Sequence, residues 1–237
     1  MKSAIALCFL AVFCTANATL LDIYRNRIGI RKRTVERTIR RVERIRDDVD
    51  RDVKLMVMEK RYKQIKEYNN YADPILDTIH KEVEDAKARG KNAQVCYDYA
   101  LHTFENIINI ATTDAWQCQE SAESSIRKNL HFINHLITTG CELIEELDNI
   151  FPNCYKTNSR LTISDRKLYS CVKNQFGISK ASVKKLKTNA RSVKSTAKSA
   201  SNNVVQEATN CLNNVYTTAR SKVPEARSVA TRCLEYV

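Results

Sequence analysis

The chain has 237 residues, of which 39 are Lys or Arg and 27 are Asp or Glu, so its formal net charge is +12. Its 4 glycines stand far apart and its 3 prolines are few. This composition excludes a P-loop and a dinucleotide fingerprint, which need clustered glycines, and it argues against a β-sandwich, which needs frequent turns.

The first eighteen residues have the pattern of a secretory signal peptide. Lys2 supplies the positive start, residues 4–14 are apolar or small, and Ala16-Asn17-Ala18 offers a cleavage site. The apolar run is far shorter than the ~20 residues that cross a bilayer. We therefore expect a secreted, extracellular mature chain without a transmembrane segment; an uncleaved N-terminal anchor is the alternative.

Residues 34–68 predict one long amphipathic helix, the main part of a basic N-terminal arm over residues 19–92. A narrow, mostly β-branched stripe steps by three and four along this helix. Such a stripe suits packing along another helix, either in cis or in a coiled coil. The members of the stripe are Val35, Ile39, Val42, Ile45, Val49, Val53, Met56, Tyr62 and Ile65.

The next helices are predicted from caps and breakers. Asp73-Pro74 has the pattern of a helix start, and Gly90 is predicted to end that helix. A second helical pattern covers residues 92–139, and Gly140 is its predicted C-cap.

The remaining elements are predicted in the same way. A short helix over residues 141–151 should stop at Pro152, before a loop over 153–164. Ser164 should cap a helix that Gly177 ends. The last long pattern covers residues 180–221, after which Pro224 either begins a terminal helix or kinks this one.

Seven cysteines remain after the predicted leader removes Cys8 and Cys14. In an oxidising compartment they are disulfide candidates, and no Cys-x-x-Cys pair supports a zinc or thioredoxin-like site. Because seven is odd, one cysteine is either free or bonds a second chain, which would give a disulfide-linked dimer. The candidates are Cys96, Cys118, Cys141, Cys154, Cys171, Cys211 and Cys233.

The spacing of these cysteines requires either bridges that join different helices or helices that fold back between the cysteines. Cys96 and Cys118 are 22 residues apart, as are Cys211 and Cys233. On one straight helix such residues lie about 33 Å apart, whereas a disulfide needs Cα atoms within about 7 Å. The sequence therefore predicts an all-α, disulfide-stapled bundle of long amphipathic helices over residues 93–237, with the N-terminal helical arm left unstapled.

Aromatic and cysteine residues of the C-terminal region form a spaced pattern. Its parts are Cys96-Tyr97-Asp98-Tyr99, Trp116-Gln117-Cys118, Cys211 and Cys233. In these residues the segment 94–237 resembles the insect secreted proteins with a TsetseEP (DUF725) domain. The resemblance implies an insect extracellular helical domain, and it implies no catalytic residue, because the family has no established one. The Glu-Pro repeats that named the family are absent from this chain.

No catalytic or metal-binding constellation is evident. His131 and His135 have the i, i+4 spacing of a chelating pair, but Phe132 stands where a zincin has its glutamate. A cluster of four carboxylates could bind calcium or act as acid and base, although a solvated helix face is the commoner arrangement. Its members are Glu142, Glu145, Glu146 and Asp148. We predict no metal, no cofactor and no enzymatic activity.

Charge is unevenly placed along the chain. Residues 19–70 carry 16 basic against 9 acidic side chains, residues 71–155 carry 6 against 14, and residues 156–237 carry 16 against 4. The basic flanks either pack against the acidic centre or bind an anionic partner such as a glycan or lipid surface. The absence of aromatic residues near the last basic run argues against nucleic acid. That run is Lys180, Lys184, Lys185, Lys187, Arg191, Lys194 and Lys198.

The leading functional hypothesis is a secreted, non-enzymatic binding or carrier protein for lipid or another hydrophobic or amphipathic small molecule. Its motivation is a set of stripe-rich helices on a stapled extracellular scaffold. The alternative is a structural or interaction protein of secretions or matrix, which acts through helix–helix contacts and disulfide-linked association.

Overall fold

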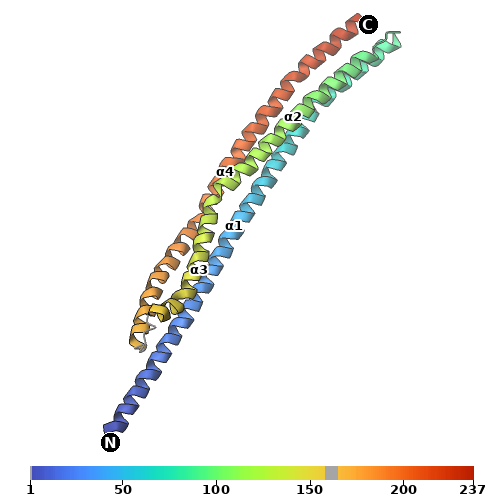
Figure 1. Ribbon diagram of the computed structural model, residues 1–237. Coiled ribbons are helices and arrows are strands. Elements are labelled where there is room, and N and C mark those ends of the chain that lie inside the picture. Colours follow the sequence, from blue (N-terminus) through green and yellow to red (C-terminus); the bar gives the residue numbers. More distant parts are fainter. Residues whose placement is uncertain (1, 158–164) are drawn as a thin grey trace. The chain divides into compact units, whose positions relative to one another are not determined.

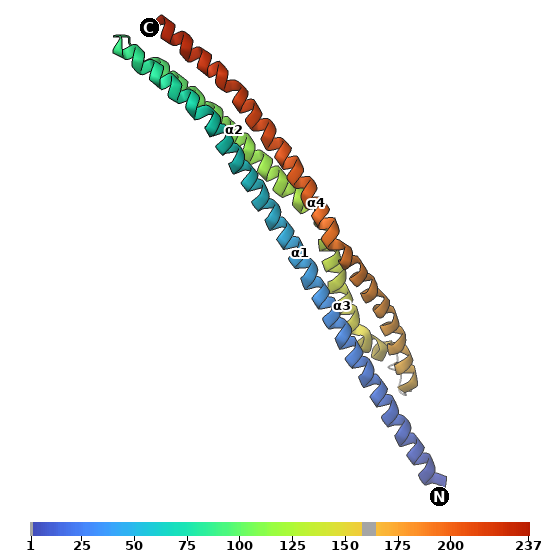
Figure 2. The same cartoon turned by 180° about the vertical axis from the view of Figure 1, so that it is seen from behind.

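In the computed structural model the described residues form four helices: α1 (Lys2–Ala88), α2 (Gln94–Asn129), α3 (His131–Thr157) and α4 (Asp165–Tyr236) (Figures 1 and 2). The structure describes residues 2–157 and 165–237, and side chains from Leu20 onward apart from Asp165. The described residues contain no strand, so the all-α prediction is confirmed. The side chains of the predicted leader lie outside the described set, and its cleavage stays a prediction.

The chain divides into two compact units. Unit 1 combines α1 up to Asp47 with Leu130–Ala197, and unit 2 combines Asp48–Asn129 with Lys198–Val237. Each unit is a bundle of three helical segments, because α1 and α4 contribute to both, α3 to unit 1 and α2 to unit 2. Neither unit coincides with the predicted N-terminal arm, residues 19–92, or with the predicted stapled bundle, residues 93–237.

The core of unit 1 is built from the apolar stripes of α1, α3 and α4. Tyr24 of α1 makes edge-on contacts with the rings of Tyr169 and Phe176, with centroids 5.7 and 5.4 Å apart. The α1 segment therefore packs in cis, which was one of the two predicted alternatives. The other buried core residues are Ile28, Val35, Ile39, Leu143, Leu147, Ile150, Cys154, Leu168, Val172, Val183 and Leu186.

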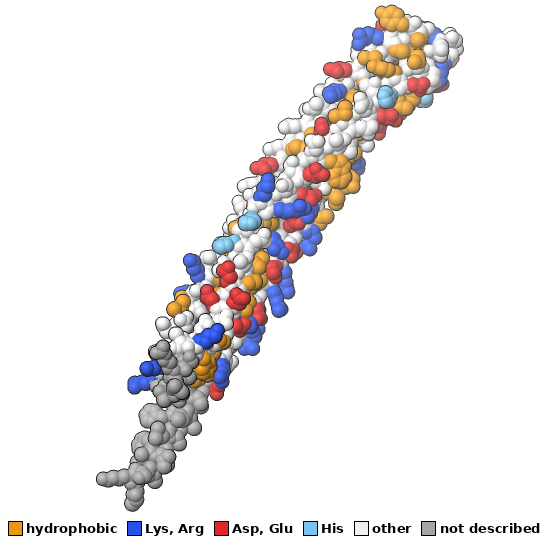
Figure 3. Space-filling model, viewed as in Figure 1, with side chains coloured by type: hydrophobic (Ala, Val, Ile, Leu, Met, Phe, Trp, Pro, Cys, Tyr) orange, Lys and Arg blue, Asp and Glu red, His pale blue; other side chains and the backbone are white. Residues whose placement is uncertain are grey.

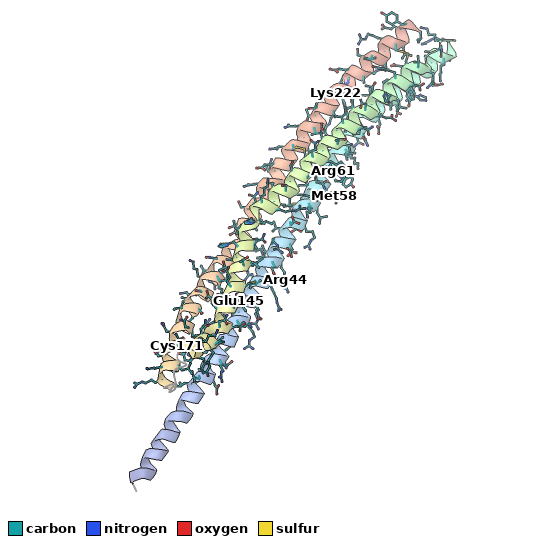
Figure 4. The ribbon with its side chains drawn as sticks, in the orientation of Figure 1. Arg44, Met58, Arg61, Glu145, Cys171 and Lys222 are labelled. Atoms are coloured by element: carbon teal, nitrogen blue, oxygen red, sulfur yellow. A yellow bond between two sulfur atoms is a disulfide. The ribbon has the colours of Figure 1, made fainter. Side chains whose placement is uncertain are left out.

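The core of unit 2 contains both buried alanines and larger apolar residues, and polar contacts join α1 to α4. Arg227 of α4 forms an ion pair with both carboxylate oxygens of Glu82 on α1, one of them at 2.7 Å. Arg61 of α1 is only 5% exposed, and its guanidinium carbon lies 3.8 Å from the ring centroid of Trp116 on α2 (Figure 4). The face of the indole ring offsets part of the cost of burying this cation.

In the described part of the chain three disulfides join different helices, which is one of the two arrangements predicted from the cysteine spacing. Cys96–Cys233 and Cys118–Cys211 connect α2 to α4, with Cα atoms 5.6 and 5.9 Å apart. The third pair, Cys154–Cys171, connects α3 to α4. The remaining cysteine of the described chain, Cys141, is free and exposed. The predicted disulfide-stapled bundle is therefore confirmed.

The helix ends differ from the prediction at the first proline. Pro74 lies inside α1, so the predicted start at Asp73 is wrong. Ala72 and Ile79, on either side of it, are 3% and 0% exposed. We infer that burial of this face outweighs the ~3 kcal/mol that an interior proline costs. The predicted end is confirmed: Gly90 has a φ of 81° and lies in the turn after α1.

The second helical pattern was extended too far. Helix α2 ends at Asn129, and Gly140 lies inside α3, so its predicted role as a C-cap is wrong. Pro152 does not stop α3, which continues to Thr157 and changes direction near its end (Figures 1 and 2). A proline removes one intrahelical hydrogen bond and crowds the preceding turn, which accounts for a bend rather than a stop.

A glycine and a proline that were predicted to end or interrupt helices lie inside α4. Gly177 and Pro224 both lie inside this helix, so the predicted end at Gly177 is wrong and Pro224 begins no new helix. The first residues of the predicted loop 153–164 are helical, while residues 158–164, including the predicted cap Ser164, lie outside the described residues. Phe176 and Ser179, on either side of Gly177, are 7% and 4% exposed, which shows that the buried face continues through the glycine.

The stability of unit 2 should fall at alkaline pH because of Tyr68. This side chain is 2% exposed, and burial, helped by the charge of Asp73, raises the pKa of Tyr68 to about 12. A tyrosine in an unfolded chain ionises near pH 10, so the unfolded state loses its proton first and stability declines as the pH rises from about 10 to 12. Urea unfolding at pH 9 and pH 11.5 should differ by roughly 1–3 kcal/mol from this group.

The Tyr68→Phe variant should lose most of that difference, because phenylalanine has no proton to release. The matched control is Tyr71→Phe, which changes a tyrosine that is 41% exposed on the same helix. An equal effect of both substitutions would contradict the assignment to Tyr68.

Candidate anion-binding groove

The seven cations of the predicted basic run on α4 are exposed, and within the described residues the acidic helix α3 forms no direct ion pair with them. None of these seven cations forms an ion pair within 4.0 Å in the described part of the chain. Asp148 of α3 instead accepts a hydrogen bond from Lys32 of α1 at 2.6 Å, and this contact raises the pKa of Lys32. Acidic residues were predicted to screen the basic run internally, but no direct ion pair joins them to this run in the described residues.

Unit 1 contains a groove between α1 and α4, which we call the cationic groove. Its cavity volume is about 230 Å³. Four of the lining residues are basic, none is acidic, and Val183, which is 2% exposed, contributes an apolar part. The lining residues are Arg31, Thr34, Val183, Lys184, Lys187, Thr188 and Arg191.

Helical spacing and helix packing together assemble this groove. Lys184, Lys187 and Arg191 step by three and four, so they share one side of α4. The two helix segments run in the same direction in unit 1 (Figures 1 and 2), and Arg31 of α1 lines the same groove as this row. The hydroxyl of Thr34 donates to the carbonyl oxygen of Ile30 at 2.9 Å, so the cations are the main donors toward a ligand.

Three of the four basic lining residues belong to the basic run predicted from the sequence, whereas Arg31 was not predicted. The sequence does show that Arg31 belongs to a basic run on α1. What the sequence does not state is which face of α1 meets α4 across more than 150 residues. Lys185 lies elsewhere, in a separate groove between α3 and α4, while Lys180, Lys194 and Lys198 are exposed along α4.

The arrangement of charge suits a multiply charged anion. Like charges that face one groove repel, and an anion bound among them removes that repulsion. Arg31 and Arg191 each present a planar guanidinium that can donate two parallel hydrogen bonds to a sulfate, phosphate or carboxylate group. The two lysines add point charges at intermediate positions.

The histidines and carboxylates form no metal centre in the described residues. His131 and His135 are exposed on α3, and no group of three or more metal-binding side chains occurs in the described part of the chain. His80 instead packs against Tyr97, with ring centroids 4.7 Å apart. The carboxylates Glu142, Glu145, Glu146 and Asp148 are exposed on α3.

Comparison with known proteins returns no relatives. No protein-family model matches the chain, and no curated protein or solved structure matches it. The resemblance of residues 94–237 to a TsetseEP domain stays a prediction. Across the described residues, no helix combines the length and apolar character needed to span a bilayer.

Proposed function

We propose that the protein is a secreted, non-enzymatic binding protein whose cationic groove holds a sulfated glycan. The observation that carries this proposal is the set of four basic side chains around one groove with no acidic neighbour in its lining. The leader pattern and the three disulfides support an extracellular setting, because disulfides form and persist in oxidising compartments. Sulfated glycans are the linear polyanions of that setting.

The test compares two variants that lose the same charge. Arg31→Gln with Lys187→Gln removes one cation from each wall of the groove. The control, Arg232→Gln with Lys91→Gln, removes an exposed arginine and an exposed lysine that do not line the groove. The groove variant should bind a heparin oligosaccharide at least about tenfold more weakly in calorimetry, a change of ~1.4 kcal/mol, while the control stays near the wild type.

Two outcomes would contradict the proposal. Equal weakening by both variants would mean that net charge alone attracts heparin. Binding to vesicles that contain anionic lipid, without saturable binding of the oligosaccharide, would assign the groove to a lipid surface instead.

A carrier role for lipid or another hydrophobic ligand remains a second proposal. Its support is the amphipathic character of all three helical segments in each unit, since such helices can part to cover an apolar ligand. Solvent extraction of protein purified from its native source tests it. Lipid content no higher than that of a control protein would remove the idea.

Disulfide-linked association is a third proposal, favoured by the free and exposed Cys141. Non-reducing gels of the native protein should then show a dimer that disappears on reduction and in the Cys141→Ser variant. A monomer under non-reducing conditions would contradict it.

A further inference from the structure

A second groove lies in unit 1, between α3 and α4, and we call it the acidic-rim groove. Its cavity volume is about 350 Å³, within the usual range of small-molecule sites, ~300–1,000 Å³. It shares no lining residue with the cationic groove. The lining residues are His135, Leu136, Thr139, Glu142, Leu143, Glu146, Ser182, Lys185, Leu186 and Asn189.

The apolar part of the acidic-rim groove comes from both helices. Leu143 of α3 and Leu186 of α4 are each 3% exposed and belong to the core of unit 1. Leu136 is partly buried and packs against the same core. A hydrocarbon group placed on these three side chains would lose contact with water at little conformational cost, because the core already holds the leucines in place.

The polar rim is dominated by negative charge on α3. Glu142 and Glu146 are four residues apart and lie on the same side of the helix as His135. Neither carboxylate forms an ion pair within 4.0 Å among the described residues, so Lys185 on the opposite wall makes no direct contact of this kind with them. Figure 3 shows acidic side chains gathered in the lower part of the visible face, close to two histidines.

The apolar surface and the acidic rim of this groove together favour one chemical class of ligand. Like charges at i, i+4 destabilise a helix by roughly 0.2–0.5 kcal/mol, and a cation between them relieves this repulsion. A bare metal ion would not use the leucines, and no group of three or more metal-binding residues occurs in the described chain. An anionic amphiphile would meet two carboxylates against one ammonium group.

We propose that the acidic-rim groove binds an amphipathic organic cation. The ammonium group lies against Glu142 and Glu146, and the hydrocarbon part lies on Leu136, Leu143 and Leu186. Charge complementarity sets the orientation of the ligand, and burial of its hydrocarbon part adds to its affinity. This site does not depend on the glycan proposal, because its residues and its ligand are different.

The probes for this site are three unbranched eight-carbon molecules that differ in the head group: n-octylammonium, n-octanol and n-octanoate. Calorimetry on the full mature chain should show saturable binding of octylammonium. Octanol and octanoate should bind at least about tenfold more weakly, because they lack the charge that the two carboxylates attract.

Two variants locate the site. Glu142→Gln with Glu146→Gln keeps the shape of both side chains and should weaken octylammonium binding about tenfold or more. The matched control is Glu145→Gln, a neighbouring exposed carboxylate of α3 that does not line the groove (Figure 4). The control should keep the wild-type affinity within about twofold, and circular dichroism should show all three proteins equally helical.

Three results would overturn the proposal. The first is octanoate binding as tightly as octylammonium, and the second is equal weakening by Glu145→Gln. The third is no saturable binding of octylammonium while the groove variants remain folded. Each result leaves the heparin experiment unaffected, so the two proposals fail separately.

Discussion

Replacing Cys118 and Cys211 together by alanine should lower the free energy of unfolding of unit 2 by about 4 kcal/mol. The two residues are 93 positions apart, but the Cys96–Cys233 bridge shortens the loop that this disulfide closes. With that bridge intact, the ring runs through residues 96–118 and 211–233, about 46 residues. The chain-entropy estimate for a ring of this length is ~4 kcal/mol.

Trp116 provides the measurement for unit 2. It is the single tryptophan of the chain and lies in α2, so its fluorescence reports the unfolding of that bundle. The midpoint of urea unfolding followed by this signal should fall strongly in the double-alanine variant. A loss below about 1 kcal/mol would mean that the unfolded chain is already compact near these helices.

The matched control removes the disulfide of unit 1. Cys154→Ala with Cys171→Ala opens a loop with a sequence separation of 17, for which the same estimate is about 3 kcal/mol. The effect should appear in the hydrogen exchange of α3 amides and leave the Trp116 transition nearly unchanged. An equal shift of the fluorescence transition would show that the two units unfold together.

Gly140→Ala should destabilise unit 1, although alanine favours a helix over glycine by about 1 kcal/mol. A Cβ at this position would lie 2.7 Å from Cγ1 and 2.8 Å from Cδ1 of Ile39. Ile39 is a β-branched residue on a helix, so its χ1 angle has one strongly preferred value and the side chain cannot easily move aside. We expect a net loss of roughly 1–3 kcal/mol, measured by hydrogen exchange of α3 amides.

The sign of this effect should reverse when Ile39 is shortened. In an Ile39→Ala background both clashing carbons are gone, and Gly140→Ala should then stabilise the protein by up to about 1 kcal/mol. Gly177→Ala is the matched control, because it is a helical glycine with nothing within 4 Å of an added Cβ. It should be stabilising in the wild-type background. If Gly140→Ala were stabilising there as well, the close packing of α3 on α1 would be contradicted.

Local sequence signals predicted the type of each element better than its limits. The apolar steps of residues 34–68 and 180–221 are recovered as parts of α1 and α4, and Gly90 ends its helix as predicted. The errors occur at Pro74, Gly140 and Gly177, which were treated as helix limits and lie inside helices. Their local cost of about 1–3 kcal/mol is smaller than the gain from burying a continuous apolar face.

Only the α4 side of the cationic groove could be predicted from the sequence. The basic row of α4 was predicted, and three of its members line the cationic groove. Arg31 could not be assigned, because its place depends on which face of α1 meets α4. The acidic-rim groove was missed for the same reason: Glu142 and Glu146 acquire an apolar partner surface only when Leu186 packs beside α3.

The sequence by itself determined that the chain is helical, that two cysteines 22 residues apart cannot bond within one straight helix, and that its charge alternates along its length. The tertiary structure alone decided which cysteines pair, which breakers a helix tolerates and which charges share a groove. Equal 22-residue spacings on α2 and α4 permit two bridges, but only antiparallel packing selects Cys96 with Cys233 and Cys118 with Cys211. The physical reason is that propensity and periodicity act over a few residues, whereas register between helices depends on burial summed over whole faces.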